Sequence, residues 1–225
     1  GGPRVVALGV DGTGRIRVDE AAKVRGDRVA ASLQAVNNET GVIQPVDEVV
    51  GSLRSGDVSV HVDAAQAVGK LEIDFGGSGW DFMSFAGHKI HGPTGTGVLV
   101  AREPARVTPL MHGGGQEGGR RSGTENLAGL VGLGVACERR RLELEACVER
   151  MRQLRDELEA RVLAAIPACV VNGAPADRVC NTANLRFPVV DGQALLAQLV
   201  VEGVHCSQSS ACTNQRPEPS YVLRA

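Results

Sequence analysis

Short apolar segments rich in valine alternate with helix-like segments in the first half of the chain. Four predicted strands can be placed: 28–36 (RVAASLQAV), a strand within 57–69 (DVSVHVDAAQAVG) that ends near Asp63, 81–86 (DFMSFA) and 97–102 (GVLVAR). Between the first two strands, PVDEVVGSLRS begins at Pro45, and a proline followed by acidic residues is typical of a helix start. Strands that alternate with helices predict an α/β fold with a largely parallel sheet.

The pattern becomes helical from Glu125 to about Ala165. Apolar residues recur there at helical spacing: Leu127, Leu130, Val131, Val135, Met151, Leu154, Leu158 and Val162. The highly charged middle, ERRRLELE, indicates either a solvated stretch or a break between two helices. A strand is predicted at 182–189, a helix at 191–203, and a loop over SQSSACTNQRPEPS.

These patterns predict a division into three parts. Residues 1–125 would form part of a large α/β domain, residues 126–165 a helical connector, and residues 166–225 part of a small C-terminal α+β domain carrying the cysteine loop. The chain opens in strand-like sequence and closes at SYVLRA without a helix stop. We therefore expect it to be a piece of a longer protein.

Composition narrows the choice of partners and of compartment. The 225 residues are 43% hydrophobic and 22% charged, with a formal net charge of −2, which is typical of a soluble globular protein. No basic stripe with interleaved aromatic residues and no membrane-length apolar run occurs, so neither nucleic acid nor a membrane is an expected partner. The cysteines are scattered without a CxxC spacing, which favours free thiols in a reducing compartment, with the cytoplasm as the default. They are Cys137, Cys147, Cys169, Cys180, Cys206 and Cys212.

Three polar residues, Asn38, Asp63 and Lys89, fall just past predicted strands. Ligands collect at the carboxyl ends of strands in α/β sheets. A lysine there is a candidate nucleophilic amine that forms a Schiff base with a cofactor aldehyde, and Asp63 is a candidate partner for a protonated pyridine nitrogen. Gln66 or Asn38 would donate to the phenolic oxygen of such a cofactor. From position alone, a surface lysine and ordinary turn or cap residues also stay open.

The histidines raise a metal alternative. His88 and His91 are three residues apart, with His61 and Asp63 nearby in sequence, but Gly92 and Pro93 argue against a shared helical face. No cysteine or carboxylate completes a familiar ligand spacing, and we predict no resident metal.

Two further segments have chemical character. GGGQEGGRRSGTEN (113–126) puts glycines, arginines and hydroxyls directly before a helix, which suits an anion such as phosphate; alternatively, Thr124 only caps that helix. Cys212 lies in the turn-rich loop SQSSACTNQRPEPS and is a candidate nucleophile there. A disulfide with Cys206 is disfavoured by the other, unpaired-looking cysteines, and a small apolar role also stays open.

Together, these segments resemble the cysteine desulfurases, pyridoxal 5′-phosphate enzymes of aminotransferase class V with the fold of type I transferases. AVNNETGVIQPV, HVDAAQAVGK, DFMSFAGHKIHGPTGTGVLVAR, GGGQEGGRRSGTEN and SSACTNQRPEPSYVLRA follow the order and spacing of that family from about Arg28 to the last residue. The resemblance is to the type that serves iron–sulfur cluster assembly. Selenocysteine lyases share most of these blocks.

The resemblance implies roles for individual residues. Lys89 would form the Schiff base and Cys212 would receive sulfur from L-cysteine as a persulfide, passing it to an acceptor such as an iron–sulfur scaffold or a thiolation enzyme. Cys212 as a transient iron–sulfur ligand is the one metal contact implied. Thr124 would reach the phosphate across a homodimer interface. The implied cofactor-binding residues are Asn38, Asp63, Gln66, Gly87, His88, Lys89 and Thr124.

The chain also departs from the family pattern. Ala86 stands where the family usually has a serine whose hydroxyl binds the phosphate, and Gly118 and Arg120 replace an arginine and an apolar residue, while Arg121 keeps its place. The family's N-terminal blocks and its C-terminal substrate-binding arginine are absent, so the chain resembles an internal fragment with little or no activity alone. Two alternatives follow: another enzyme of this fold, such as a selenocysteine lyase or a C–S lyase, or an inactive interaction module.

Overall fold

The structure is a computed structural model that describes residues 4–26, 28–53, 57–208 and 220–225. The chain divides into two compact units. The sheet unit comprises residues 21–35 and 45–145, and the second unit comprises residues 1–20, 36–44 and 146–225. The domain boundaries expected after residues 125 and 165 stay a prediction.

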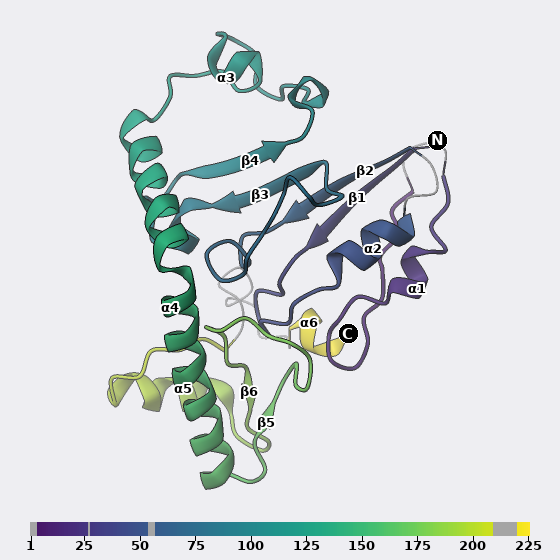
Figure 1. Ribbon diagram of the computed structural model, residues 1–225. Helices are drawn as coiled ribbons and strands as arrows, with labels where there is room; N and C mark the ends of the chain where they lie inside the picture. Colours follow the sequence, from purple (N-terminus) through teal and green to yellow (C-terminus); the bar gives the residue numbers. More distant parts are fainter. Residues whose placement is uncertain (1–3, 27, 54–56, 209–219) are drawn as a thin grey trace. The chain divides into compact units, whose positions relative to one another are not determined.

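The sheet unit is built on four strands in the order β1-β2-β3-β4 (Figure 1). They are β1 (Arg28–Gln34), β2 (Asp57–Asp63), β3 (Phe82–Ala86) and β4 (Gly97–Ala101). The first three run parallel and β4 runs antiparallel to β3. All four predicted strands are therefore confirmed, and so is the α/β class.

Successive side chains of a strand point to opposite faces of the sheet. Apolar residues at alternate positions of β2 therefore make one face apolar. Val60 and Val62 of β2 are fully buried on that face. Helix α2 (Val46–Leu53) follows Pro45, as predicted, and contacts β2. Its buried residues are Val46, Val49, Val50 and Leu53. The intervening positions of β2, such as His61 and Asp63, consequently point to the opposite face.

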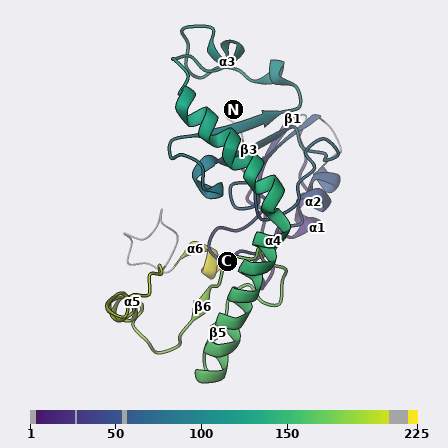
Figure 2. The ribbon, with the colours of Figure 1, turned by 60° about the vertical axis from the view of Figure 1, so that its left-hand side comes forward.

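Helix α4 (Leu127–Ala165) is one continuous helix of 39 residues (Figure 2). The suggested break in its charged middle is therefore wrong. Its first turn is capped by Asn126, whose Oδ1 accepts a hydrogen bond from the backbone N–H of Gly129 at 3.0 Å. Thr124 is thus not the N-cap. Leu133 and Ala136 of α4 pack on Ile90, which holds the loop after β3 against the helix.

Two glycines of α4 give a matched test of this packing. A Cβ at Gly132 would lie 2.6 Å from Cγ of Pro93, whereas a Cβ at Gly134 would meet nothing within 4 Å. Gly134→Ala is expected to raise the free energy of unfolding by ~0.5–1 kcal/mol through helix propensity. Gly132→Ala is expected to lower it by ~1–3 kcal/mol through overpacking. Thermal unfolding of both variants checks this; equal shifts in the same direction would contradict the packing account.

The remaining elements are short. In the sheet unit they are η1 (Gly87–Ile90), η2 (Pro104–Arg106) and α3 (Gln116–Gly119). Elsewhere they are α1 (Val18–Ala21), β5 (Val170–Val171), β6 (Leu185–Arg186), α5 (Gly192–Val201) and α6 (Tyr221–Arg224). The strand predicted at 182–189 is reduced to two residues in β6, while the helix predicted at 191–203 is confirmed as α5. Over the described ranges, no helix has the length and apolar character required to span a membrane.

Candidate active site

The carboxyl ends of β2 and β3 lie side by side, because Asp63 pairs with Ser84 in the parallel ladder. Asp63 is the last residue of β2 and is half-buried. Its Oδ1 accepts a hydrogen bond from the backbone N–H of Ala65 at 2.9 Å, and its carbonyl accepts one from Ala35 at 2.9 Å. The carboxylate is therefore held at the strand end by the backbone that follows it.

Gln66 lies in the tight turn that leaves β2. The backbone N–H groups of Ala67 and Val68 both donate to the carbonyl of Ala64 at 2.9 Å, which closes the turn around Gln66. The Gln66 side chain is half-buried. Gln66 thus follows Asp63 at the same end of the sheet, as the sequence predicts.

Lys89 lies in η1, the single 3₁₀ turn that follows β3. Gly87 and Ile90 of this turn are buried, while His88 and Lys89 are exposed. His91 ends the turn in the left-handed conformation (φ 63°), with its N–H donating to the carbonyl of Gly87. The turn is anchored at its two ends, and its middle residues are presented to solvent.

Gly87 has a packing reason to be glycine. A Cβ at this position would lie 2.2 Å from Oγ1 of Thr96 and 3.1 Å from Cδ1 of Leu133. Oγ1 of Thr96 is fixed in turn, because it donates to the carbonyl of Pro93 at 2.7 Å. The glycine therefore lets the lysine turn pack directly against Thr96 and against Leu133 of α4.

Thr124 and Arg121 are exposed in the segment before α4. Arg120 is engaged differently, since its Nε donates to the carbonyl of Pro104 at 2.9 Å. Asn38 belongs to the second unit and is exposed there. It lies in the loop of residues 37–44, where Oδ1 of Asn37 accepts from the N–H groups of Glu39 (2.9 Å) and Thr40 (3.0 Å).

The sheet unit thus gathers Asp63, Gln66, His88 and Lys89 at the ends of two neighbouring parallel strands. Cys212 lies outside the described residues. Among the described cysteines, burial raises the pKa of the Cys137 thiol, which disfavours a nucleophilic role for it. In the described part of the chain, no group of three or more His, Cys, Asp or Glu side chains is arranged to hold a metal ion.

One feature of this site was missed from the sequence. The ring of His61 lies between two serine hydroxyls, Ser32 of β1 and Ser84 of β3, with both nitrogen–oxygen distances 2.9 Å. The only available signal was alternation, which puts His61 on the same face of β2 as Asp63. Which residues lie opposite His61 depends on strand register, and the sequence does not give the register.

The sequence profile of the family described as Aminotransferase class-V matches residues 1–225. The chain belongs to this family. It is 42% identical over 225 residues to a "Cysteine desulfurase" of Trichormus azollae and 44% identical to "Cysteine desulfurase NifS" of Azotobacter vinelandii, covering all of this chain and 56% of each relative. The chain therefore spans about half the length of these relatives.

The fold of this family member has a solved counterpart. A structure described as "NIFS-LIKE PROTEIN" superposes with a TM-score of 0.86 at 35% identity, covering 91% of this chain and 56% of that one. This likeness confirms the expected type I transferase fold.

Proposed function

We propose that the complete protein containing this chain is a pyridoxal-phosphate-dependent cysteine desulfurase. The observation that carries the proposal is the placement of Asp63 and Lys89 at the ends of neighbouring parallel strands, with the lysine turn anchored by Gly87 and Ile90. The names of the relatives point to the same activity. The donor set of amine, carboxylate, amide and imidazole fits the aldehyde, ring and phosphate of that cofactor.

Each residue has a role in this proposal. Bound pyridoxal phosphate supplies an aldehyde for covalent attachment and a protonated ring that withdraws electrons from the substrate. Asp63 would hold the proton on the pyridine nitrogen, and Lys89 would provide the attachment point and would accept the α-proton of L-cysteine at Nζ. Gln66 and Asn38 would donate to the phenolic oxygen, whereas Gly87, His88 and Thr124 would contribute to the phosphate side.

In this proposal, Cys212 carries out the sulfur transfer. Its thiolate attacks the sulfur of the substrate, so that an S–S bond forms while the substrate C–S bond breaks. The electron pair of the broken bond stays on the substrate carbon, which takes up a proton, and alanine is released. The products are L-alanine and a Cys212 persulfide.

The same proposal includes the partners and the compartment. We place Thr124 at a homodimer interface and propose an iron–sulfur scaffold or a thiolation enzyme as the sulfur acceptor, with Cys212 as a transient cluster ligand. Among the described cysteines, Cys137, Cys147, Cys169 and Cys206 are free thiols, which supports a reducing compartment such as the cytoplasm.

The decisive experiment combines spectroscopy with a sulfur assay on the complete protein. Titration with pyridoxal phosphate is expected to produce a visible absorption band, and addition of L-cysteine is expected to yield alanine and protein-bound persulfide. Cys212→Ala is expected to keep the band and to lower sulfur release with a physiological acceptor by ~10²-fold or more, because the nucleophile is lost.

Other outcomes identify the alternatives. Full sulfur release by Cys212→Ala would contradict sulfur relay and indicate a C–S lyase. A marked preference for selenocysteine over cysteine would indicate a selenocysteine lyase. A protein that stays colourless at saturating cofactor would be an interaction module, an outcome that Ala86 favours because no hydroxyl is available at that position.

A further inference from the structure

The His61 side chain links three strands through hydrogen bonds on the face of the sheet that also carries Asp63. Its Nδ1 lies 2.9 Å from Oγ of Ser32 on β1, and its Nε2 lies 2.9 Å from Oγ of Ser84 on β3. Both ring nitrogens are therefore engaged. A hydroxyl donates or accepts as required, so either tautomer of the ring satisfies both contacts.

These side-chain contacts coincide with backbone contacts to the end of β2. The carbonyl of Ser84 accepts from the N–H of Ala64 at 2.8 Å, and the N–H of Ala35 donates to the carbonyl of Asp63 at 2.9 Å. Ser84 thus contacts the chain on both sides of Asp63, through its hydroxyl at His61 and through its carbonyl at Ala64. The last residues of β2 are held from β1 and from β3 at the same time.

The connection to β3 also reaches the lysine turn. Ser84 is two residues from the end of β3, and the chain passes from there through Ala86 and Gly87 to Lys89. A group that fixes β2 to Ser84 therefore fixes the separation of the Asp63 carboxylate from the Lys89 turn. Displacement of a reacting group by about 1 Å costs on the order of 10²-fold in rate, so this separation matters for catalysis.

We infer that His61 is a positioning residue. By bridging Ser32 and Ser84, it fixes the position of the Asp63 carboxylate relative to Lys89. Asp63 and Lys89 would then reach the pyridine nitrogen and the aldehyde of the same cofactor. This inference rests on the proposed function. It assigns His61 no contact with the cofactor or the substrate.

The binding and activity test uses the complete protein and four variants. His61→Phe removes both contacts, whereas His61→Gln puts an amide near the Nε2 position and keeps the contact with Ser84. Ser84→Ala removes that contact from the other side. Ser59→Ala is the matched control: it lies two residues earlier on the same face of β2, and its hydroxyl accepts from Nη2 of Arg106.

The expected readouts are the dissociation constant of pyridoxal phosphate, from visible titration of the apoprotein, and kcat and KM for L-cysteine. His61→Phe and Ser84→Ala are each expected to raise the dissociation constant and to lower kcat by ~10-fold, with KM nearly unchanged. His61→Gln is expected to recover most of both losses. Ser59→Ala is expected to leave both quantities unchanged, even where it lowers the unfolding temperature.

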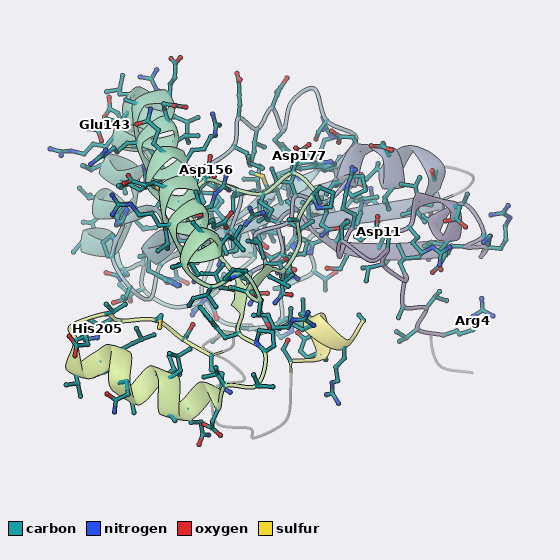
Figure 3. The ribbon with its side chains drawn as sticks, turned by 90° about the horizontal axis from the view of Figure 1, so that it is seen from below. Arg4, Asp11, Glu143, Asp156, Asp177 and His205 are labelled. Carbon is teal, nitrogen blue, oxygen red and sulfur yellow. The ribbon has the colours of Figure 1, made fainter. Side chains whose placement is uncertain are left out.

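Histidine ¹⁵N NMR of the apoprotein supplies a readout that does not depend on activity. The Nε2 resonance of His61 is expected to move in Ser84→Ala, and the Nδ1 resonance in a Ser32→Ala variant, while exposed His205 beyond α5 (Figure 3) serves as the internal reference.

Failure of the inference is distinct from failure of the proposed function. A colourless wild-type protein would overturn the function. A coloured wild type whose His61→Phe and Ser84→Ala variants keep the cofactor affinity and kcat within ~2-fold would overturn only the positioning role. The same holds if His61→Gln is as impaired as His61→Phe, or if Ser59→Ala shows the same losses.

Discussion

Lys89→Ala is expected to abolish the visible band of the complete protein with pyridoxal phosphate and to lower alanine formation from cysteine by ~10²–10⁴-fold or more. The reason is that one amine serves both as the covalent attachment point and as the base for the α-proton, and loss of a positioned base alone costs that much. Lys89 is exposed at the middle of η1, between buried Gly87 and Ile90. Its removal should therefore leave the fold unchanged.

Two controls sharpen this experiment. Lys89→Arg keeps the positive charge but provides no amine that attacks an aldehyde or accepts a proton near neutral pH, so it should be as inactive as Lys89→Ala. Lys23→Ala removes another exposed lysine and should behave as wild type. Borohydride reduction followed by peptide mass analysis should locate the cofactor on Lys89. Attachment at a different lysine, or an unchanged band in Lys89→Ala, would contradict the proposed role.

Much of the sheet unit could be predicted because its signals are local. Alternating valines in β2 and the Pro45 helix start fix element type without knowledge of the neighbours. The direction of β4 could not be predicted from the sequence. It pairs antiparallel with β3, and no local feature of residues 97–101 distinguishes an antiparallel from a parallel strand. The strand predicted at 182–189 is only Leu185–Arg186 in the structure, because β propensity alone does not stabilise a strand outside a larger sheet.

The continuity of α4 also has a physical reason. The stretch ERRRLELE consists of arginine, glutamate and leucine, all of which favour helix, so a solvated middle need not be a break. The N-terminus of this helix was less well predicted, because asparagine and threonine are both good caps and only the structure shows that Asn126 is used.

The candidate site also has a part that the sequence predicts and a part that it does not. Asp63 ends β2, and Gln66 and Lys89 follow the ends of β2 and β3, which sequence alone locates; the parallel ladder then brings them to one end of the sheet. The Ser32–His61–Ser84 contacts depend on three-strand register and were not predictable. The role of Cys212 stays a prediction, as does the placement of Asn38 in cofactor binding.

A buried ion pair in the second unit fixes residues 177–179. This segment is hydrogen-bonded to the loop of residues 37–44, which contains Asn38. Arg178 donates to both carboxylate oxygens of Glu159 on α4, at 2.6 and 2.7 Å, and each side chain is only 10% exposed. The hydrogen bonds to Glu159 raise the pKa of the Arg178 guanidinium above its usual value. The loop is joined to the same segment by Ile43 N–H to the Asp177 carbonyl and by Val179 N–H to the Gly41 carbonyl, both at 2.9 Å.

Arg178→Met is therefore expected to lower the free energy of unfolding by about 3–5 kcal/mol, because the carboxylate of Glu159 is left buried without its partner. Urea unfolding of the complete protein measures this loss. The matched control is Arg152→Ala, which removes the exposed pair with Glu149 on the same helix and should cost less than ~1 kcal/mol.

The double variant Arg178→Met with Glu159→Leu separates the two costs in this site. It removes both charges, so it should recover a large part of the stability lost in Arg178→Met. Because the segment of residues 177–179 is hydrogen-bonded to the loop of residues 37–44, Arg178→Met should also loosen that loop, and the double variant should restore part of its order. If Arg178→Met proves no more destabilising than Arg152→Ala, the ion pair does not hold this segment, and the loop depends on the backbone contacts alone.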